Sequence, residues 1–283
     1  MNREFSRRSF LSFLAATPVT GATAIRALAA GKPIPIGLEL YSVRNDLQKD
    51  LMGTVRKVAK LGYQCVEFYS PYYEWTVDYT KRVRAELDGL GIHCYSTHND
   101  PVSFAPGGVN KAMELNRILG SRYIVMASAG EVSGADGWKR VAETLNTANE
   151  TMKAHGLHAG YHNHDAEWRQ VGDQKPIEIL AANTDSSIML QLDVGTCLEA
   201  GADPVAWVKK NPGRIRSLHL KDWSPEKQYA VLFGEGVAPW KELLQAAETE
   251  GGAEFFLIEQ EGSRYRELET AKRCLEGYRK LHG

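Results

Sequence analysis

The chain has 283 residues, of which 43% are hydrophobic and 24% charged, and its formal net charge is −1. This composition is ordinary for a globular domain and supplies enough apolar residues for a core. After the N-terminal segment there is no basic run, which argues against a nucleic-acid partner, and no apolar stretch long enough for a transmembrane helix.

The first 29 residues predict an export signal. A twin-arginine pattern at residues 6–11 (Ser-Arg-Arg-Ser-Phe-Leu) precedes a weakly apolar stretch, and residues 27–29 (Ala-Leu-Ala) form a small-x-small cleavage site. Pro18 and Gly21 interrupt the apolar stretch, which is typical of a removable signal and not of a membrane anchor. We therefore expect a signal peptide over 1–29 and a periplasmic or secreted domain over 30–283, with no stable membrane insertion after cleavage.

Strand-like and helix-like segments alternate through the first half of this domain. We predict strands at 36–40, 65–68, 92–95 and 123–126. The predicted helices cover 47–61, 77–90, a segment ending at 119, and 136–155. In the first helix, Leu47, Leu51, Val55 and Val58 recur at helical spacing, and Gly62 marks its end.

The second half continues this alternation. Predicted strands at 157–161, 188–192, 215–220 and 255–258 are followed by helices at 177–182, 204–210, 239–250 and 268–281. Eight such units in about 254 residues predict an α/β fold, a single-domain (β/α)8 TIM barrel. An open doubly wound sheet would require a Gly-rich loop after the first strand, and residues 39–44 (Glu-Leu-Tyr-Ser-Val-Arg) are not one.

Metal-binding side chains stand where the last four predicted strands end. They are His162, Asp193, His219 and Glu259. The carboxyl ends of barrel strands converge on one face, so these groups form a plausible ligand set for one divalent cation. His164 lies two residues after His162 and points to the same side of an extended strand, so either histidine is a candidate ligand.

The first half supplies candidates for the opposite wall of the barrel mouth, among them Glu39. The predicted substrate contacts are Tyr41, Arg44, Glu67, His98, Glu167 and Trp223. Lys221, two residues past His219, projects to the same side of its strand as that histidine.

Several of these segments together resemble one known family. They include residues 161–168 (Tyr-His-Asn-His-Asp-Ala-Glu-Trp), 40–44 (Leu-Tyr-Ser-Val-Arg), 219–222 (His-Leu-Lys-Asp), 234–236 (Gly-Glu-Gly) and 258–261 (Ile-Glu-Gln-Glu). The chain resembles the xylose isomerase-like barrel family, and within it the sugar phosphate isomerase/epimerase group. The resemblance implies one divalent metal (Mn, Mg, Co or Zn) held by Glu, Asp, His and Glu from strands five to eight. His162 departs from this pattern, because it stands where the epimerases carry the first Glu.

The resemblance further implies a sugar isomerase or epimerase that abstracts a proton next to a metal-bound carbonyl of a keto-sugar or keto-glycoside. Glu259 is the expected first proton carrier, with His164 or Lys221 as the second. The alternatives are a lyase, dehydratase or hydrolase acting on 3-keto-glycosides, or a non-catalytic carbohydrate-binding barrel. A small carbohydrate is the expected partner, and a homo-oligomer is left open.

Overall fold

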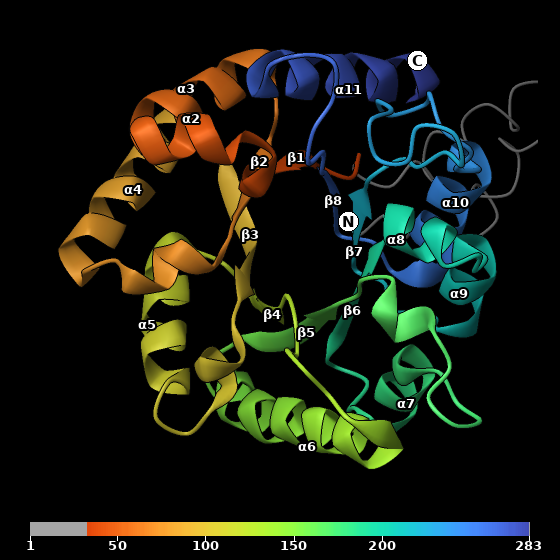
Figure 1. The fold of residues 1–283 in the computed structure, drawn as a ribbon. Coiled ribbons are helices and arrows are strands. Elements are labelled where there is room, and N and C mark those ends of the chain that lie inside the picture. Colours follow the sequence, from red (N-terminus) through yellow and green to blue (C-terminus); the bar gives the residue numbers. More distant parts are fainter. Residues whose placement is uncertain (1–32, 283) are drawn as a thin grey trace, which may run out of the picture. The chain divides into compact units, whose positions relative to one another are not determined.

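The computed structural model describes residues 33–282, which form a closed barrel of eight parallel strands paired in chain order (Figure 1). The strands are β1 (Ile36–Glu39), β2 (Cys65–Phe68), β3 (His93–Asn99), β4 (Tyr123–Met126), β5 (His158–His162), β6 (Met189–Asp193), β7 (Ser217–Leu220) and β8 (Phe255–Ile258). The prediction of a TIM barrel is therefore confirmed. The predicted signal peptide lies outside the described residues.

Helices surround the barrel, and most lie where the sequence predicts them. They are α2 (Arg44–Lys49), α3 (Leu51–Leu61), α4 (Val77–Leu90), α5 (Val109–Leu119), α6 (Gly134–Lys153), α7 (Pro176–Asn183), α8 (Val194–Glu199), α9 (Pro204–Lys210), α10 (Trp240–Ala246) and α11 (Glu267–His282). Short helical turns add η1 (Leu40–Val43), η2 (Ser70–Glu74), η3 (Pro101–Phe104), η4 (Ala166–Trp168) and η5 (Ala247–Gly251).

The predicted helix at 47–61 is wrong as a single element. Asp50 has an extended backbone (φ −154°) and ends α2, and its side chain accepts a hydrogen bond from the Gly53 amide as the N-cap of α3. An Asp favours such a cap over a helix interior, so apolar periodicity alone does not reveal the break.

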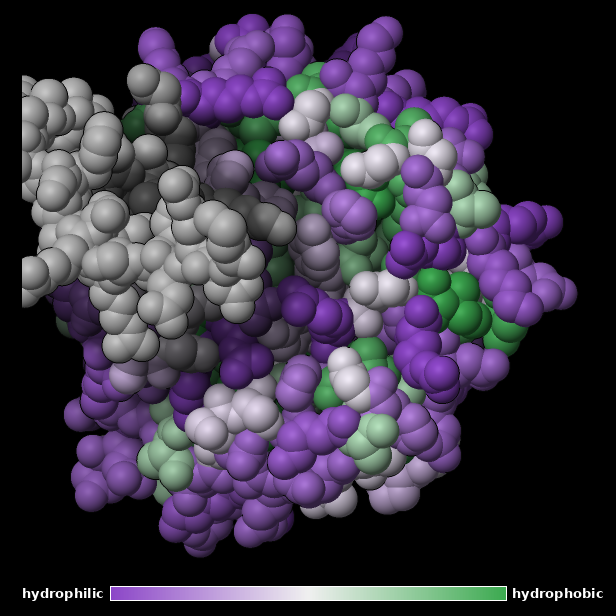
Figure 2. Space-filling model, turned by 180° about the vertical axis from the view of Figure 1, so that it is seen from behind, coloured by the Kyte–Doolittle hydropathy of each residue, from purple (hydrophilic) through white to green (hydrophobic). Residues whose placement is uncertain are grey.

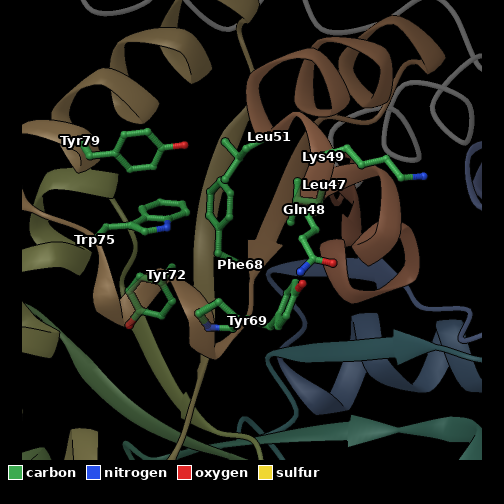
Figure 3. Close-up of a pocket in the computed structure, with 10 residues that line it drawn as sticks. Leu47, Gln48, Lys49, Leu51, Phe68, Tyr69, Tyr72, Trp75 and Tyr79 are labelled. Carbon is green, nitrogen blue, oxygen red and sulfur yellow. The ribbon is translucent and has the colours of Figure 1, made fainter.

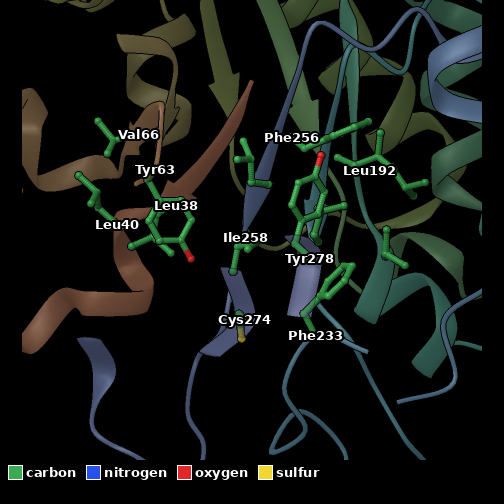
Figure 4. Close-up of a cluster of buried hydrophobic side chains, with 14 of the residues drawn as sticks. Leu38, Leu40, Tyr63, Val66, Leu192, Phe233, Phe256, Ile258, Cys274 and Tyr278 are labelled. Carbon is green, nitrogen blue, oxygen red and sulfur yellow. The ribbon is translucent and has the colours of Figure 1, made fainter. Parts of the chain in front are cut away.

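Alternation along each strand sorts its side chains between the outer core and the barrel interior. Leu38, Val66, Phe256 and Ile258 belong to the large outer core, which also includes Tyr278 and Cys274 of α11 (Figure 4). Their neighbours face the interior, where strand register places Glu39 beside Glu67 and Asp193 beside His219. Because all strands run in parallel, the polar groups at their carboxyl ends meet on one face.

The described surface is mainly hydrophilic on the face seen in Figure 2, where apolar areas are small and separated. Large exposed hydrophobic side chains among residues 33–282 are Tyr41, Val102, Val237 and Leu281. Within this range, no helix combines the length and apolar character needed to cross a membrane.

Candidate metal centre

Four buried side chains converge at the carboxyl ends of β5 to β8. His162 ends β5, Asp193 ends β6, His219 lies within β7, and Glu259 directly follows β8. One ligand atom from each lies within 4.8 Å of the others. The structure thus brings together the four residues that the sequence predicts as ligands.

The two carboxylate oxygens of Asp193 have different roles: one caps a helix, and the other faces the candidate metal centre. Oδ1 accepts a hydrogen bond from the Thr196 amide, 2.8 Å away, and so caps α8. Oδ2 accepts no hydrogen bond, although it is fully buried, and lies 3.9 Å from His162 Nε2 and 3.7 Å from Lys221 Nζ. Burial raises the pKa of Asp193 against the opposing pull of Lys221. A buried carboxylate oxygen without a donor is what a cation would satisfy.

His219 stands between two carboxylates. Its Nδ1 lies 2.6 Å from Glu259 Oε2, and its Nε2 lies 2.8 Å from Glu67 Oε2. Burial opposes a charge on the ring, but Glu67 and Glu259 outweigh it and raise the pKa of His219 well above its usual value. The two carboxylates therefore favour the protonated ring, and loss of one ring hydrogen would free a nitrogen of His219 to hold a cation.

Lys221 places a buried ammonium beside the same carboxylates. Its Nζ lies 3.6 Å from Glu259 Oε1, is paired with Glu261, and stands 4.6 Å from the centre of the Tyr229 ring. Burial opposes the charge, but Glu259 and Asp193 raise the pKa of Lys221 well above its usual value. Burial also opposes ionisation of Glu259, yet Lys221 and His219 hold the pKa of Glu259 well below its usual range. Glu259 is therefore an ionised carboxylate at neutral pH.

A layer of hydrogen-bonding side chains supports the imidazoles. Glu67, fully buried, accepts hydrogen bonds from Ser96, from His219 Nε2 and from Gln191 Nε2 at 3.1 Å, and its Oε2 lies 3.1 Å from His98 Nε2. Sequence reasoning missed Gln191 and Ser96, because a polar residue inside a strand does not reveal which way it faces. Glu67 and His98, predicted to touch substrate, have these protein partners here.

Glu39 faces the same interior from β1. Its Oε2 accepts from the Tyr41 amide at 2.7 Å, while its Oε1 is buried and accepts no hydrogen bond. Burial, together with Glu259, raises the pKa of Glu39 well above its usual value. The surroundings of Glu39 thus favour the protonated form of this carboxyl group.

The other predicted substrate residues lie around the rim. Tyr41 is exposed, the Arg44 guanidinium stands 4.4 Å from its ring centre, and Trp223 is partly buried. Glu167 is buried, and its two oxygens accept from the Tyr161 hydroxyl and the His164 amide. His164 lies past the end of β5 and is exposed, with its ring centre 5.0 Å from that of His162.

An aromatic cavity of about 420 Å³ lies outside the barrel wall, beside β2 (Figure 3). Five aromatic residues form half of its lining, with Leu47 and Leu51 facing them: Phe68, Tyr69, Tyr72, Trp75 and Tyr79. Tyr69 also packs edge-on against Tyr41 at 5.4 Å, so the cavity adjoins the rim without including the four candidate ligands.

The donor set fits a divalent transition metal. Two imidazoles and two carboxylates are ligands that Zn²⁺, Mn²⁺ and Co²⁺ accept, whereas Mg²⁺ favours oxygen ligands and water. A second group, His98, His162 and His219, also has the required proximity. Its His98 Nε2, however, already lies 2.7 Å from Gln191 Oε1, so the set containing Asp193 and Glu259 fits better.

Fold and site together define a TIM barrel with a candidate metal centre at the carboxyl ends of its strands. The xylose isomerase-like TIM barrel family matches residues 55–281, most of the chain, and the chain therefore belongs to this family.

Individual relatives differ in their activities. An inosose dehydratase of Clostridium botulinum is 30% identical over 140 residues, which cover 42% of this chain and 46% of that protein. The chain spans less than half the length of the curated relatives that it matches. A sugar phosphate isomerase/epimerase of Parabacteroides distasonis superposes with a TM-score of 0.74 at 24% identity, covering 88% of this chain and 94% of that one. The IOLI protein, solved with a bound zinc atom, has a TM-score of 0.66 at 15% identity and covers 88% and 98%. At these identities the two structures show the shared fold alone.

Proposed function

We propose that the protein is a metal-dependent lyase of the dehydratase type. It removes a proton next to the carbonyl of a keto-sugar or keto-glycoside and releases an oxygen substituent from the next carbon. A divalent metal at the candidate centre would supply positive charge that stabilises the negative charge developing on the carbonyl oxygen.

One observation carries the choice of elimination. Glu259 and Lys221 stand on the same side of the centre, with Oε1 and Nζ 3.6 Å apart, whereas the strand-five position holds the neutral imidazole of His162. Burial, reinforced by His219 and His98, lowers the pKa of His162 well below its usual value. Proton carriers on opposite faces of one carbon suit epimerisation, and a single carboxylate beside an ammonium suits elimination.

The residues divide this reaction as follows. Glu259 takes the proton, and the electron pair of the broken C–H bond forms the new C=C bond as the C–O bond to the substituent breaks. Glu259 then returns the proton to the departing oxygen, to which the Lys221 ammonium donates a hydrogen bond. The inosose dehydratase relatives support a reaction of the dehydratase type.

An isomerase or epimerase is the second candidate, favoured by the likeness to the Parabacteroides isomerase/epimerase structure. In this reaction a second group must deliver a proton to another face or carbon. Lys221 and His164 are the sequence-based candidates, and the carboxyl group of Glu39, whose pKa is raised by burial, is a third.

Product analysis in heavy water distinguishes the candidates. Metal-loaded protein is incubated with keto-sugars and 3-keto-glycosides, and products are followed by NMR and mass spectrometry. Release of the substituent with an unsaturated ketone supports the lyase. A deuterated epimer or isomer that retains the substituent refutes it and supports the second candidate. Metal binding with neither release nor exchange across the panel supports a carbohydrate-binding barrel.

We also propose that the protein acts outside the cytoplasm, on free or glycosidic sugars. The twin-arginine pattern and the cleavage site at residues 27–29 support this location. Replacing Arg7 and Arg8 by lysine is expected to retain the precursor inside the cell, and unchanged export would refute a twin-arginine route.

A further inference from the structure

Gln191 is not a candidate ligand, but its side chain contacts two of the buried histidines, His98 and His162. It is the third residue of β6, is 1% exposed, and faces the barrel interior two residues before Asp193. Its Oε1 lies 2.7 Å from His98 Nε2 and 3.1 Å from His162 Nδ1. Its Nε2 lies 3.1 Å from Glu67 Oε1 and 3.4 Å from Ser217 Oγ.

The partners of the amide fix which end faces which way. Glu67 already accepts hydrogen bonds from Ser96 and His219, so it is an acceptor, and the group facing it must donate. The amide nitrogen therefore faces Glu67, and the amide oxygen faces the two imidazoles. An amide oxygen only accepts, so the ring nitrogens beside it, His98 Nε2 and His162 Nδ1, must both carry hydrogens.

This arrangement selects one tautomer of His162. A neutral imidazole carries a single N–H, so a hydrogen on Nδ1 leaves Nε2 with a free lone pair. Nε2 is the atom that lies 3.9 Å from the unpartnered Oδ2 of Asp193. We propose that Gln191 is a positioning residue that holds the hydrogen of His162 on Nδ1 and thereby presents Nε2 to a divalent cation. This inference rests on the metal centre of the proposed function.

The same amide oxygen also distinguishes between the two candidate ligand sets, the one with His98 and the one with Asp193 and Glu259. His98 Nε2 donates to Gln191 and lies 3.1 Å from Glu67 Oε2, so this nitrogen is already engaged within the protein. Gln191 thus leaves Nε2 of His162 available to a cation, whereas Nε2 of His98 is engaged in a hydrogen bond with Gln191 itself. Partners that fix the tautomer of a metal-binding histidine typically contribute about 10–100-fold to metal affinity.

The tautomer is measured first, in metal-free wild-type protein, from the ¹H–¹⁵N correlations of the imidazole nitrogens. We expect the hydrogen of His162 on Nδ1 and a bare Nε2. A hydrogen on Nε2 would overturn the proposal without any variant, so a variant that fails to fold does not leave it undecided. This measurement is also independent of whether the metal centre or the proposed reaction is correct.

The second measurement compares zinc affinity between Gln191→Met and Ser217→Ala, using competition with a chelator. Met has a similar length but cannot hold the Nδ1 hydrogen, so we expect about 10–100-fold weaker binding and a mixture of His162 tautomers. Ser217→Ala removes another partner of the same amide and leaves the histidine contacts, so its affinity is expected near wild type. Unchanged affinity and tautomer in Gln191→Met would refute the proposal, and equal losses in both variants would reduce Gln191 to a packing role.

Discussion

The two halves of the barrel contribute differently to the centre. Strands β5 to β8 supply the four candidate ligands, and one of them keeps a free oxygen, Asp193 Oδ2. Strands β2 and β3 supply Glu67, Ser96 and His98. Ser96 donates to Glu67, and Glu67 and His98 hydrogen-bond with His219 and Gln191 of the second half. The second half therefore offers groups to a ligand, and Glu67, Ser96 and His98 of the first half orient those groups together with Gln191 of β6.

His219 joins the two halves, because its ring bonds Glu259 on one side and Glu67 on the other. The division predicts a hierarchy. Changes to the four candidate ligands should abolish metal binding or chemistry, and changes to the residues that orient them should weaken both.

The largest effect is expected for Asp193→Ala, which should lose stoichiometric metal. The alanine also removes the cap of α8, at a cost of about 1 kcal/mol in folding free energy. Asp193→Asn keeps an oxygen for that cap and separates the two effects. Elemental analysis of both variants, with Asp165→Asn at the rim as control, tests the assignment. Wild-type metal content in Asp193→Ala would show that Asp193 is not a ligand.

Glu259→Gln should keep most of the metal and lose most of the chemistry. Gln retains an oxygen and nearly the same volume but cannot take a proton, and removing a positioned proton carrier typically costs about 10²–10⁴-fold in rate. Solvent-proton exchange into substrate, measured with metal content in the same sample, provides the test. Near wild-type exchange with metal bound would leave Glu259 as a ligand only and shift the role of base to His164 or Lys221.

The sequence was sufficient to predict the candidate ligands and insufficient to predict the residues that orient them. Asp193 and Glu259 stand where apolar runs stop, and parallel strands bring such ends together. Gln191, between Leu190 and Leu192, gives no such signal, since its direction depends on strand register. His98 illustrates the same limit. The predicted third strand stops at 95, whereas β3 extends to Asn99 and carries His98 inside the barrel.

Glu67→Gln tests the residues that orient the ligands and should weaken zinc binding by about 10–100-fold without abolishing it. An amide has a single acceptor oxygen and cannot accept from His219, Ser96 and Gln191 as the carboxylate does. Chelator competition against Glu86→Gln, a carboxylate that pairs with Arg56 on the helical surface, measures the difference. A complete loss of metal would mean that Glu67 belongs with the ligands and not with their supports.

Metal affinity should also depend on pH through His219. Its pKa is raised above 6.5 in the metal-free protein, so above pH 6.5 the ring still holds a proton that the cation must displace. Affinity should therefore rise about tenfold per pH unit below the folded-state pKa of His219, and level off above it. Calorimetry in buffers of different ionisation enthalpy should record release of about one proton. Binding without proton release near pH 7 would contradict the pairing of His219 with two carboxylates.

The smallest effect is expected for His164→Ala, and it decides between the two histidines of residues 161–164. His162 ends β5, is buried, and has an Nε2 atom near Asp193, whereas His164 lies beyond the strand and is exposed. An exposed side chain past the strand end contributes to the centre only if it turns back toward it. We therefore expect His164→Ala to keep near wild-type zinc affinity and His162→Ala to lose most of it, measured by the same chelator competition. The reverse order would make His164 the strand-five ligand, and His162 would then join Gln191 and Glu67 among the residues that orient the others.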